Sequence, residues 1–398
     1  MHVPFCVSLC PYCDFVVYAG AAARGGTNGL DAFVEALLVE LDLRADALDA
    51  AFGPPGRDRP MLTSVYLGGG TPSLLATRSI EAILGRVRAR FGIVDGAEVT
   101  IEANPGPDER GDPAAFVRLG VTRLSLGAQR LDVPELRRLG RRHHPGDVAD
   151  AVAEARRAGI ASVAIDLLYD IPDDSAPAWS ASLKAAIDLQ PDHLSLYGLT
   201  LDDPAAEGLA SPDGDHLPTP GGARRWRDRA RPRQDEDRAA DAYTVATDRL
   251  EAAGFRGYEI SNWARPGHES RHNRTYWERR PHEAVGPGAH AFDGRARRWN
   301  AARLDRYAAA LTPADGSRPR LPPGGSETID EAGARTEAVM LALRTDRGLP
   351  AIAAGEPPLA GVHAWALEAG LLHTTADNRI VLTTRGRLLS NELFARLV

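Results

Sequence analysis

Short aliphatic runs alternate with helical patterns along the first half of the chain. The predicted strands are Leu62–Leu67, Glu98–Glu102, Arg123–Leu126, Ser162–Leu168 and His193–Tyr197. The predicted helices between them are Asp31–Ala51, Thr77–Phe91, Pro113–Leu119, Gly146–Ala158 and Ala176–Leu189. In the fourth helix, Val148, Val152 and Ala155 recur at helical spacing and form one apolar stripe. Repeated βα units imply a parallel sheet covered by helices, so we expect an α/β barrel or an open part of one.

Polar and glycine residues follow several of these strands directly. Gly68-Gly69-Gly70-Thr71 ends the second barrel strand, and Glu102-Ala103-Asn104 ends the third. Gln129 follows the fourth strand, and Asp166 lies near the end of the fifth. Ligands bind at the carboxyl ends of the strands in such folds, and glycines let the backbone approach a ligand closely. The sequence therefore predicts a ligand site at this rim.

Composition excludes several classes of protein. The chain of 398 residues is 43% hydrophobic and 25% charged, as in globular proteins. No stretch approaches 18 uninterrupted apolar residues, which argues against a membrane-spanning helix and allows at most peripheral membrane contact. With 47 basic and 54 acidic residues the net charge is −7, so a broadly basic, nucleic-acid-binding surface is not expected.

Cys6, Cys10 and Cys13 are the only cysteines of the chain. An odd number of closely spaced cysteines is a poor disulfide framework, and their absence elsewhere is typical of a reducing cytosol. A signal peptide ending near Ala21-Ala22-Ala23 is disfavoured, because no Lys or Arg precedes it and Asp14 interrupts the apolar segment. Three thiolates on one loop can bind three irons of a cubane cluster and leave the fourth open. The alternative is a zinc site completed by His2.

The later part of the chain is less regular. The stretch from Asp202 to Arg233 is rich in Pro, Gly, Asp and Arg and has no clear period, so we interpret it as a solvated insertion or linker. Its basic run Arg224–Arg227 is mixed with acidic residues, which favours a solvated loop over a nucleic-acid site. Helical pattern resumes at Asp237–Ala253. Small helices at Glu327–Arg344, Leu359–Ala369 and Thr384–Leu397, with a strand at Arg379–Leu382, are typical of a winged-helix-like module acting as a structural cap.

Ten ordered motifs resemble one known family. The segment His2–Phe15 (HVPFCVSLCPYCDF) resembles the cluster loop of the radical S-adenosylmethionine (SAM) superfamily, and specifically the group of oxygen-independent coproporphyrinogen III oxidase and its heme-chaperone branch. The other motifs are YLGGGTPSLL, IEANPG, LSLGAQ, LGRRH, IDLLY, HLSLY, YEISNW, HNRTYW and GPGAH, in order from residue 66 to residue 290. The resemblance implies a partial (β/α)6 TIM-like barrel followed by a small α+β winged-helix-like domain.

The resemblance also implies the cofactors and the residues that bind them. Cys6, Cys10 and Cys13 would hold a [4Fe–4S] cluster whose open iron chelates SAM, so the zinc alternative loses weight, and an electron donor must exist. The residues implied to bind SAM are Tyr12, Gly69, Gly70, Thr71, Glu102, Gln129, Arg141 and Asp166. Without the cysteines, the favoured interpretation of Glu102 and Asp166 would be buried carboxylates with structural partners, since solitary carboxylates have many such roles.

Two functions share this cluster, namely a heme chaperone and a coproporphyrinogen III oxidase. Phe15 stands where the oxidase carries a fourth cysteine, and only five residues precede Cys6, whereas the oxidase has a long N-terminal segment. Both differences favour the chaperone branch. The HNRTYW motif resembles the motif associated with heme there, so His272 is the expected heme residue, and His290, His143 and His144 are weaker candidates. The expected role is delivery of heme to apo-hemoproteins, with those of the respiratory chain as candidates, by a cytoplasmic protein that binds no nucleic acid.

The chain departs from the family pattern at several positions. Arg130 would bring a large cation near the pocket, Asp170 replaces a glycine-led turn, and Ser270 stands where many relatives have cysteine. The first barrel strand is almost missing, which suggests a start codon assigned too late. The expected organisation is a barrel over 1–200, an insertion over 201–236, a continuation of the core over 237–325 and the C-terminal domain over 326–398.

Overall fold

A central sheet of eight strands is the largest sheet of the protein. The computed structural model describes residues 1–20, 29–201 and 208–398. The strand order of the central sheet is β1-β4-β5-β6-β7-β8-β10-β9. The strands are β1 (His2–Val3), β4 (Leu62–Gly69), β5 (Ile93–Ala103), β6 (Arg123–Gln129), β7 (Ser162–Tyr169), β8 (His193–Gly198), β10 (Asn262–Ala264) and β9 (Arg256–Gly257). The first six are mutually parallel, and β10 and β9 continue the sheet in antiparallel fashion. This arrangement confirms the partial (β/α)6 barrel.

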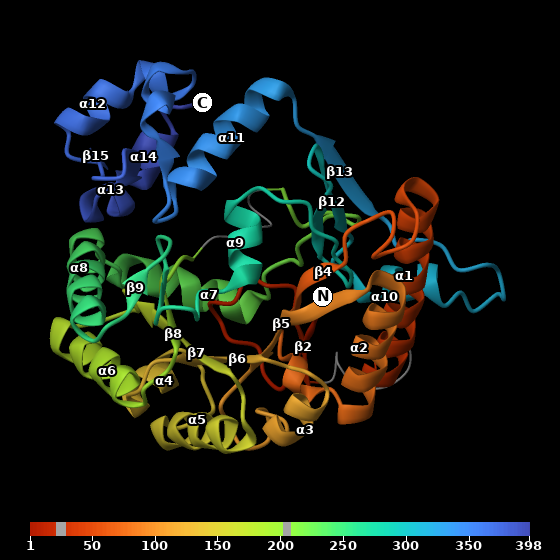
Figure 1. Cartoon of the computed structure of the whole chain (residues 1–398). Coiled ribbons are helices and arrows are strands. Elements are labelled where there is room, and N and C mark those ends of the chain that lie inside the picture. The colour runs from red at the N-terminus through yellow and green to blue at the C-terminus, as the bar shows by residue number, and fades with distance from the viewer. Residues whose placement is uncertain (21–28, 202–207) are drawn as a thin grey trace.

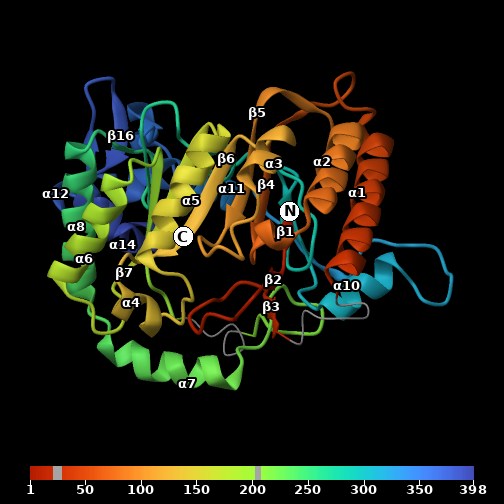
Figure 2. The same ribbon diagram turned by 90° about the horizontal axis from the view of Figure 1, so that it is seen from below.

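Helices cover the outer face of the strands, as Figure 1 and Figure 2 show. They are α1 (Leu30–Phe52), η3 (Pro72–Leu74), α2 (Thr77–Phe91), α3 (Pro113–Arg118), α4 (Val133–Arg138), α5 (Pro145–Ala158) and α6 (Ala176–Asp188). On α5 the predicted stripe of Val148, Val152 and Ala155 is buried. Burying this stripe against the sheet is what holds such a helix in place, because helix propensity alone is a weak force.

The first barrel strand is present but only two residues long. His2 pairs with Gly68 and Val3 with Gly69 in parallel register. The Cβ of an added side chain at Gly70 would come within 2.6 Å of the Phe5 carbonyl oxygen, and one at Gly69 within 2.7 Å of the His2 ring. The glycines at the end of β4 therefore also allow the N-terminal segment to pack on the sheet, in addition to lying at the rim.

The insertion predicted over 201–236 contains a helix that the sequence analysis missed. Residues 202–207, like Ala21-Ala22-Ala23, lie outside the described residues, but α7 (Gly221–Ala230) and η4 (Arg231–Arg233) follow. Figure 2 shows α7 lying beside the N-terminal loop. Arg227 in the basic run is 3% exposed, so the interpretation of that run as a solvated loop is wrong for this residue. Its helical period was hidden because Arg, Ala and Gly supply few apolar markers.

Residues 236–328 continue the same core. They form α8 (Glu236–Ala252), α9 (Arg271–Trp277), α10 (Leu304–Leu311) and an antiparallel sheet of β11 (His290–Phe292), β12 (Ala296–Asn300) and β13 (Gly324–Thr328). One cluster of buried apolar side chains extends from Val3 to Leu311. The buried carboxylate of Glu40 on α1 links the layers, because it accepts hydrogen bonds from Gly286 N (2.8 Å) and Tyr307 Oη (2.7 Å).

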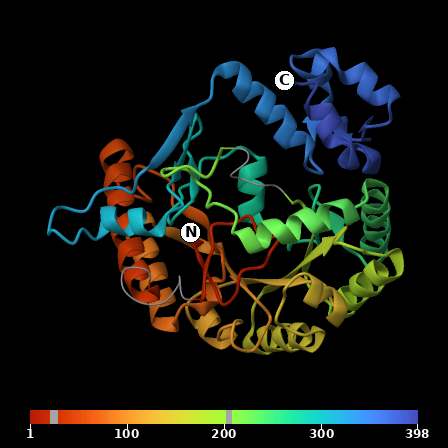
Figure 3. The same cartoon turned by 180° about the vertical axis from the view of Figure 1, so that it is seen from behind.

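The C-terminal segment has a hydrophobic core of its own, from Leu343 to Leu397, and lies to one side of the barrel (Figure 3). It comprises α11 (Glu331–Leu343), η5 (Ala351–Gly355), η6 (Leu359–Gly361), α12 (His363–Glu368), α13 (Thr384–Leu388) and α14 (Ser390–Phe394). Its sheet contains β14 (Leu349–Pro350), β16 (Arg379–Leu382) and β15 (Leu372–Thr374) in antiparallel order. None of the helices described is long and apolar enough to cross a membrane.

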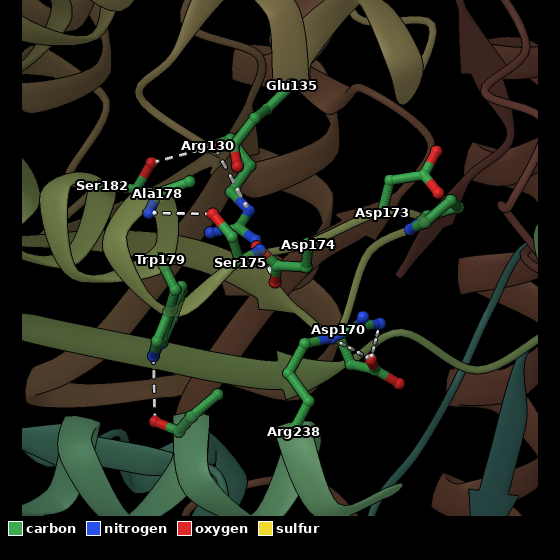
Figure 4. A network of polar contacts seen from close by, with 12 residues as sticks. Arg130, Glu135, Asp170, Asp173, Asp174, Ser175, Ala178, Trp179, Ser182 and Arg238 are labelled. Atoms are coloured by element: carbon green, nitrogen blue, oxygen red, sulfur yellow. Dashed lines mark hydrogen bonds and ion pairs between the residues drawn. The ribbon is translucent and has the colours of Figure 1, made fainter. Parts of the chain in front are cut away.

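Arg130 does not line the rim, contrary to the expectation that it places a cation near the pocket. Its side chain is fully buried, forms an ion pair with Asp174, lies 3.7 Å from Glu135 Oε2 through Nε, and stacks over the Trp179 ring at 5.0 Å (Figure 4). Because both carboxylates are buried, their charges require this cation. Arg130 is therefore a structural residue beneath the rim.

The other two departures also have structural explanations. Asp170 adopts φ +54°, a left-handed conformation that Asp tolerates better than most residues, and pairs with Arg238 Nη2 at 2.6 Å. Asp170 thus makes the turn without glycine. Ser270 is the N-cap of α9, where its Oγ accepts a hydrogen bond from Asn273 N at 3.1 Å.

Candidate functional site

A cavity of about 560 Å³ opens at the carboxyl ends of the parallel strands. The cysteine loop forms one side, and the strand ends form the other. The residues of the sequence analysis that line it are Cys6, Cys10, Tyr12, Cys13, Gly69, Gly70, Glu102, Gln129, Arg141, His143, Asp166 and Ser270. Thr71 is buried beside it and does not line it. Residues more than 150 positions apart in the sequence therefore share one cavity, which we call the rim cavity.

Cys6 ends strand β2 (Phe5–Cys6), and Cys10 and Cys13 lie on the loop between β2 and β3 (Tyr18–Ala19). Cys6 Sγ lies 3.2 Å from Thr71 Oγ1, and Arg141 Nη1 donates to Cys10 Sγ at 3.5 Å. Burial raises the pKa of Cys6 to about 11 and that of Cys13 to about 12. These thiols therefore keep their protons at neutral pH unless iron replaces them.

The donor set fits a cubane cluster better than a single metal ion. Among the side chains described, no group of three or more His, Cys, Asp or Glu is arranged to hold one metal ion. Around a cubane each thiolate binds a different iron, so the sulfur atoms need not converge on one point. His2 does not complete a zinc set with the thiols, because it lines a different cavity and its Nε2 lies 2.8 Å from the Val16 carbonyl oxygen.

The α7 helix fixes this loop from outside. Arg227 Nε donates to the Pro11 carbonyl at 3.1 Å, and its Nη2 donates to the Cys13 carbonyl at 2.8 Å. Trp226 contacts Tyr12 with 6.4 Å between ring centroids. The Gly-poor cysteine loop is thereby held at two backbone positions by one buried guanidinium. Sequence reasoning missed Arg227 because nothing in the local pattern indicates its contact with residues more than 200 positions away.

Glu102 is a buried carboxylic acid at the rim. Its Oε1 accepts from Tyr66 Oη at 2.6 Å, and its Oε2 accepts from Gly69 N at 2.9 Å. Burial raises the pKa of Glu102 to about 7, and the nearby charge of Asp166 adds to the effect. Burial also raises the pKa of Asp166, which accepts from Ser125 Oγ at 3.1 Å. A cationic ligand would restore ionisation of both, so this side of the cavity suits an ammonium or sulfonium group.

Arg141 connects the cysteine loop to two strand ends. Its Nη2 donates at 2.6 Å both to Asn104 Oδ1 and to the Gly127 carbonyl. Asn104 Nδ2 in turn donates to Glu109 Oε2 at 2.7 Å, and Glu109 also lines the cavity. Arg141 lies on the turn after α4, and from there its side chain reaches the site as expected. Sequence reasoning missed Tyr66 and Glu109, for which only the tertiary contacts provide a signal.

A second cavity of about 610 Å³ adjoins the first. We call it the histidine cavity, because five histidines line it, namely His2, His216, His272, His282 and His290. Its wall also contains aromatic rings and three arginines, namely Phe15, Tyr66, Tyr276, Phe292, Arg279, Arg280 and Arg297. Asp14, Phe15, Tyr66 and Gly69 line both cavities, so the two share a wall.

His272 lies in this second cavity, on helix α9. Its backbone N–H donates to Glu98 Oε1 at 3.0 Å, which anchors the start of α9 on β5. Its ring stacks on Tyr66 at 4.8 Å between centroids. Burial lowers the pKa of His272 to about 3, so its imidazole is neutral and able to coordinate a metal.

The weaker histidine candidates fall in different places. His290 lines the histidine cavity and pairs with Asp215 Oδ2 at 2.9 Å. His143 is buried at the rim cavity, with Nε2 3.1 Å from the Ala128 carbonyl oxygen. His144 is exposed and lines neither cavity.

Comparison with known proteins agrees with this architecture. The family model of the radical SAM superfamily matches residues 1–178. The heme chaperone HemW of Mycobacterium tuberculosis is 38% identical over all of this chain and 94% of its own length. HemW of Escherichia coli is 35% identical over 77% of this chain and 74% of its own. Coproporphyrinogen III oxidase (HemN) of Escherichia coli superposes with a TM-score of 0.76 over 100% of this chain and 88% of that one, at 20% identity, which shows the common fold.

The partial parallel barrel with three cysteines at its rim defines the class of protein, the radical SAM proteins. Full-length identity then specifies the branch. The chain belongs to the family of the heme chaperone HemW.

Proposed function

We propose that this protein is a cytoplasmic heme chaperone, which binds heme in the histidine cavity and transfers it to apo-hemoproteins, with those of the respiratory chain as candidate recipients. A [4Fe–4S] cluster and SAM occupy the rim cavity in this proposal, and an electron donor serves the cluster. The main observation in support of this proposal is that the two cavities share a wall, which consists of Asp14, Phe15, Tyr66 and Gly69. The family relationship to HemW supports it independently.

The histidine cavity has the chemistry that a heme requires. Its volume of about 610 Å³ lies within the roughly 300–1,000 Å³ usual for cofactor-sized ligands. The rings of Phe15, Tyr66, Tyr276 and Phe292 offer flat apolar surface for a porphyrin. Arginine side chains in the same wall match the two carboxylates of heme, since a guanidinium binds a carboxylate through paired hydrogen bonds.

His272 belongs to this proposed heme site. Its neutral ring lies against Tyr66, whose hydroxyl donates to Glu102 in the rim cavity. A ligand that moves His272 would therefore also affect Tyr66, whose hydroxyl contacts Glu102 on the side of the wall proposed for SAM. The proposed role of SAM and the cluster is to support folding or a regulatory or redox step, and this chain of contacts is a route by which they would do so.

The residues at the rim cavity have separate proposed roles there. The three thiolates hold the cluster, which when bound supplies an open iron and one electron. Gly69, Gly70, Glu102 and Asp166 accept the cationic part of SAM. Arg141 and Gln129 meet its polar groups, and Tyr12 flanks the adenine. Thr71, which is buried, supports Cys6 through its hydroxyl and not by direct contact with SAM.

The alternative function, oxidation of coproporphyrinogen III, would use the same cluster as the proposed chaperone but for a different reaction. Phe15 stands at the position of the oxidase's fourth cysteine and is 64% exposed in the shared wall. The fold alone does not separate the two functions, because the HemN likeness extends over the whole chain at low identity.

One sample can test both functions. The full chain is reconstituted with iron and sulfide without oxygen and titrated with hemin, then mixed with the apo form of a b-type cytochrome while the absorption spectrum is followed. The proposal expects saturable hemin binding and transfer to the apo-protein. Absence of saturable binding, or anaerobic conversion of coproporphyrinogen III to protoporphyrinogen IX by the same sample, would overturn it.

A further inference from the structure

The interior of the partial barrel carries polar side chains that extend away from the cysteine loop. Alternate residues of a strand face the same side, and the residues of β6 that line the rim cavity are Arg123, Ser125, Gly127 and Gln129. On β8 the alternate lining residues are His193, Ser195 and Tyr197. Arg123 and Gln129 begin and end β6, which at roughly 3.3 Å per residue separates them by about 20 Å along the strand. The rim cavity therefore extends well inward from the strand ends.

Arg123 is a buried cation at this inner end. The residue is 4% exposed, and its Nη1 donates to Ser162 Oγ at 3.0 Å and to the His268 carbonyl at 2.9 Å. Across the residues that the structure describes, no carboxylate forms an ion pair with Arg123, and its Nε and Nη2 have no hydrogen-bond partner. A buried charge is costly unless an opposite charge accompanies it. An anionic ligand would supply that charge.

Two carboxylates on neighbouring strands, Glu98 of β5 and Asp166 of β7, are engaged elsewhere. Glu98 accepts three hydrogen bonds at the start of α9. Asp166 accepts from Ser125 Oγ at 3.1 Å. Burial raises the pKa of Asp166, and serine hydroxyls and the charge of Arg123 offset this only in part. Neither carboxylate therefore neutralises Arg123.

His193 supplies a second buried donor near this cation. It is 2% exposed, and its Nε2 lies 3.0 Å from Tyr258 Oη. Tyr258 Oη accepts from Asn273 Nδ2 at 3.5 Å, so its own proton is directed to His193 Nε2, which assigns the ring proton to Nδ1. This Nδ1 is buried and has no hydrogen-bond partner in the described part of the chain. Burial, together with the charge of Arg123, lowers the pKa of His193 well below its ordinary value, so the ring is neutral.

The donors at the inner end fit one carboxylate group. Thr100, the register partner of Arg123 on β5, has a buried hydroxyl that finds no partner among the described side chains and backbone. A guanidinium binds a carboxylate through paired hydrogen bonds, and an imidazole N–H and a hydroxyl can add further donors. Arg123 supplies a single positive charge and His193 is neutral, so a singly charged carboxylate fits better than a doubly charged phosphate.

We propose that the inner end of the rim cavity binds a small organic carboxylate, with Arg123 and His193 Nδ1 as its donors. The site is distinct from that proposed for SAM, which lies at the cysteine loop and the strand ends. The cavity of about 560 Å³ must admit both molecules, so the second ligand is small. This inference goes beyond the proposed function, because the carboxylate site depends neither on heme nor on its transfer.

Titration of the full chain, reconstituted with its cluster, with formate, acetate and propanoate at constant ionic strength tests the site. Saturation-transfer nuclear magnetic resonance of the carboxylate reports binding directly. We expect saturable binding of at least one of the three by wild type, at least tenfold weaker binding by Arg123→Met, and partial recovery in Arg123→Lys, which keeps the charge but not the planar fork. Arg118→Met is the matched control and should bind as wild type, because Arg118 is exposed on α3, just before the same strand.

Thermal melting separates a ligand site from a structural arginine. Arg123→Met removes an unpaired buried cation, so without carboxylate it should melt at or above the wild-type temperature. The bound carboxylate should raise the melting temperature of wild type in a saturable way and leave that of Arg123→Met unchanged. A melting temperature of Arg123→Met below that of wild type, with no response of wild type to carboxylate, would assign Arg123 a structural role instead.

Arg141→Met separates the carboxylate site from the site proposed for SAM, and it should keep the wild-type affinity for carboxylate. The inference is overturned if none of the three carboxylates binds wild type, or if Arg141→Met loses as much affinity as Arg123→Met. Phosphate that binds more tightly than every carboxylate would also overturn it. Absence of hemin or SAM binding in the same sample would count against the proposed function only, since the carboxylate titration needs neither molecule.

Discussion

The guanidinium of Arg141 contacts the thiol of Cys10, with Nη1 3.5 Å from Sγ, while its Nη2 holds the Gly127 carbonyl at the end of β6. One side chain therefore ties the cysteine loop to the sheet. Burial by itself lowers the pKa of Arg141, but the neighbouring Tyr12 and Cys10 side chains outweigh it and raise the pKa above its usual value. The position of the loop over the strands depends on this contact.

The first prediction concerns Arg141. Replacing it by Met should weaken SAM binding by tenfold or more, about 1.4 kcal/mol, because three polar contacts and a charge are lost. Arg141→Lys keeps the charge but not the planar fork, so it should recover only part of the affinity. Equilibrium binding of SAM to reconstituted protein measures this, with iron content as the control. Full affinity in Arg141→Met would contradict the role.

The second prediction is a pH dependence set by Glu102. Its folded-state pKa of about 7 lies above the ordinary glutamate value of 4.5, so between these values the folded protein holds a proton that the unfolded chain has released. This contribution to stability is present at low pH and is lost as pH rises through 7, by about 2 kcal/mol between pH 5.5 and pH 8. Urea unfolding of the cluster-free protein at both values measures it. Glu102→Gln should lose less stability over that interval, and an identical loss would exclude Glu102 as the cause.

The third prediction tests the buried charges of Figure 4. Arg130→Met leaves Asp174 and Glu135 buried without their cation and should cost about 3–5 kcal/mol of unfolding free energy. The matched control is Arg233→Met, because Arg233 and Asp173 form an exposed pair, each 56% exposed. Such a pair contributes about 0–1 kcal/mol. Equal losses in the two variants, by urea unfolding, would refute the structural role of Arg130.

The fourth prediction concerns Glu40 on α1. Its carboxylate is fully buried and joins Arg44, Asn300, Gly286 and Tyr307. Glu40→Ala should therefore destabilise the protein by about 3–5 kcal/mol, since it leaves a buried cation and several donors unpaired. Glu35→Ala on an exposed position of the same helix is the control and should change stability by less than about 0.5 kcal/mol. Thermal melting distinguishes them.

The fifth prediction concerns the hold of α7 on the cysteine loop. Arg227→Ala removes the donors to the Pro11 and Cys13 carbonyls, so the loop should open more often. Iron should then leave the reconstituted cluster several-fold faster in the presence of a chelator, while the initial iron content stays normal. Arg225→Ala, an exposed neighbour on the same helix, should release iron at the wild-type rate. Equal release rates for the two variants would contradict this role of Arg227.

The sequence alone determined the repeated βα architecture, the cysteine loop and the family. Strand β16 (Arg379–Leu382) and helix α2 (Thr77–Phe91) have the predicted bounds, because their hydrophobic periods are strong and local. Gln129, Glu102 and Asp166 could be placed at one rim in advance, since parallel strands bring their carboxyl ends together.

Only the tertiary structure decided which side chains meet across that rim. Arg130 looked like a pocket cation but is buried, because Asp174 and Trp179, more than 40 positions away in the sequence, pack against it. Arg227 carries no local signal, since it acts on a loop over 200 residues distant. Local periodicity specifies elements, whereas long-range packing specifies which atoms face a cavity, and the chemistry of this protein depends on the second.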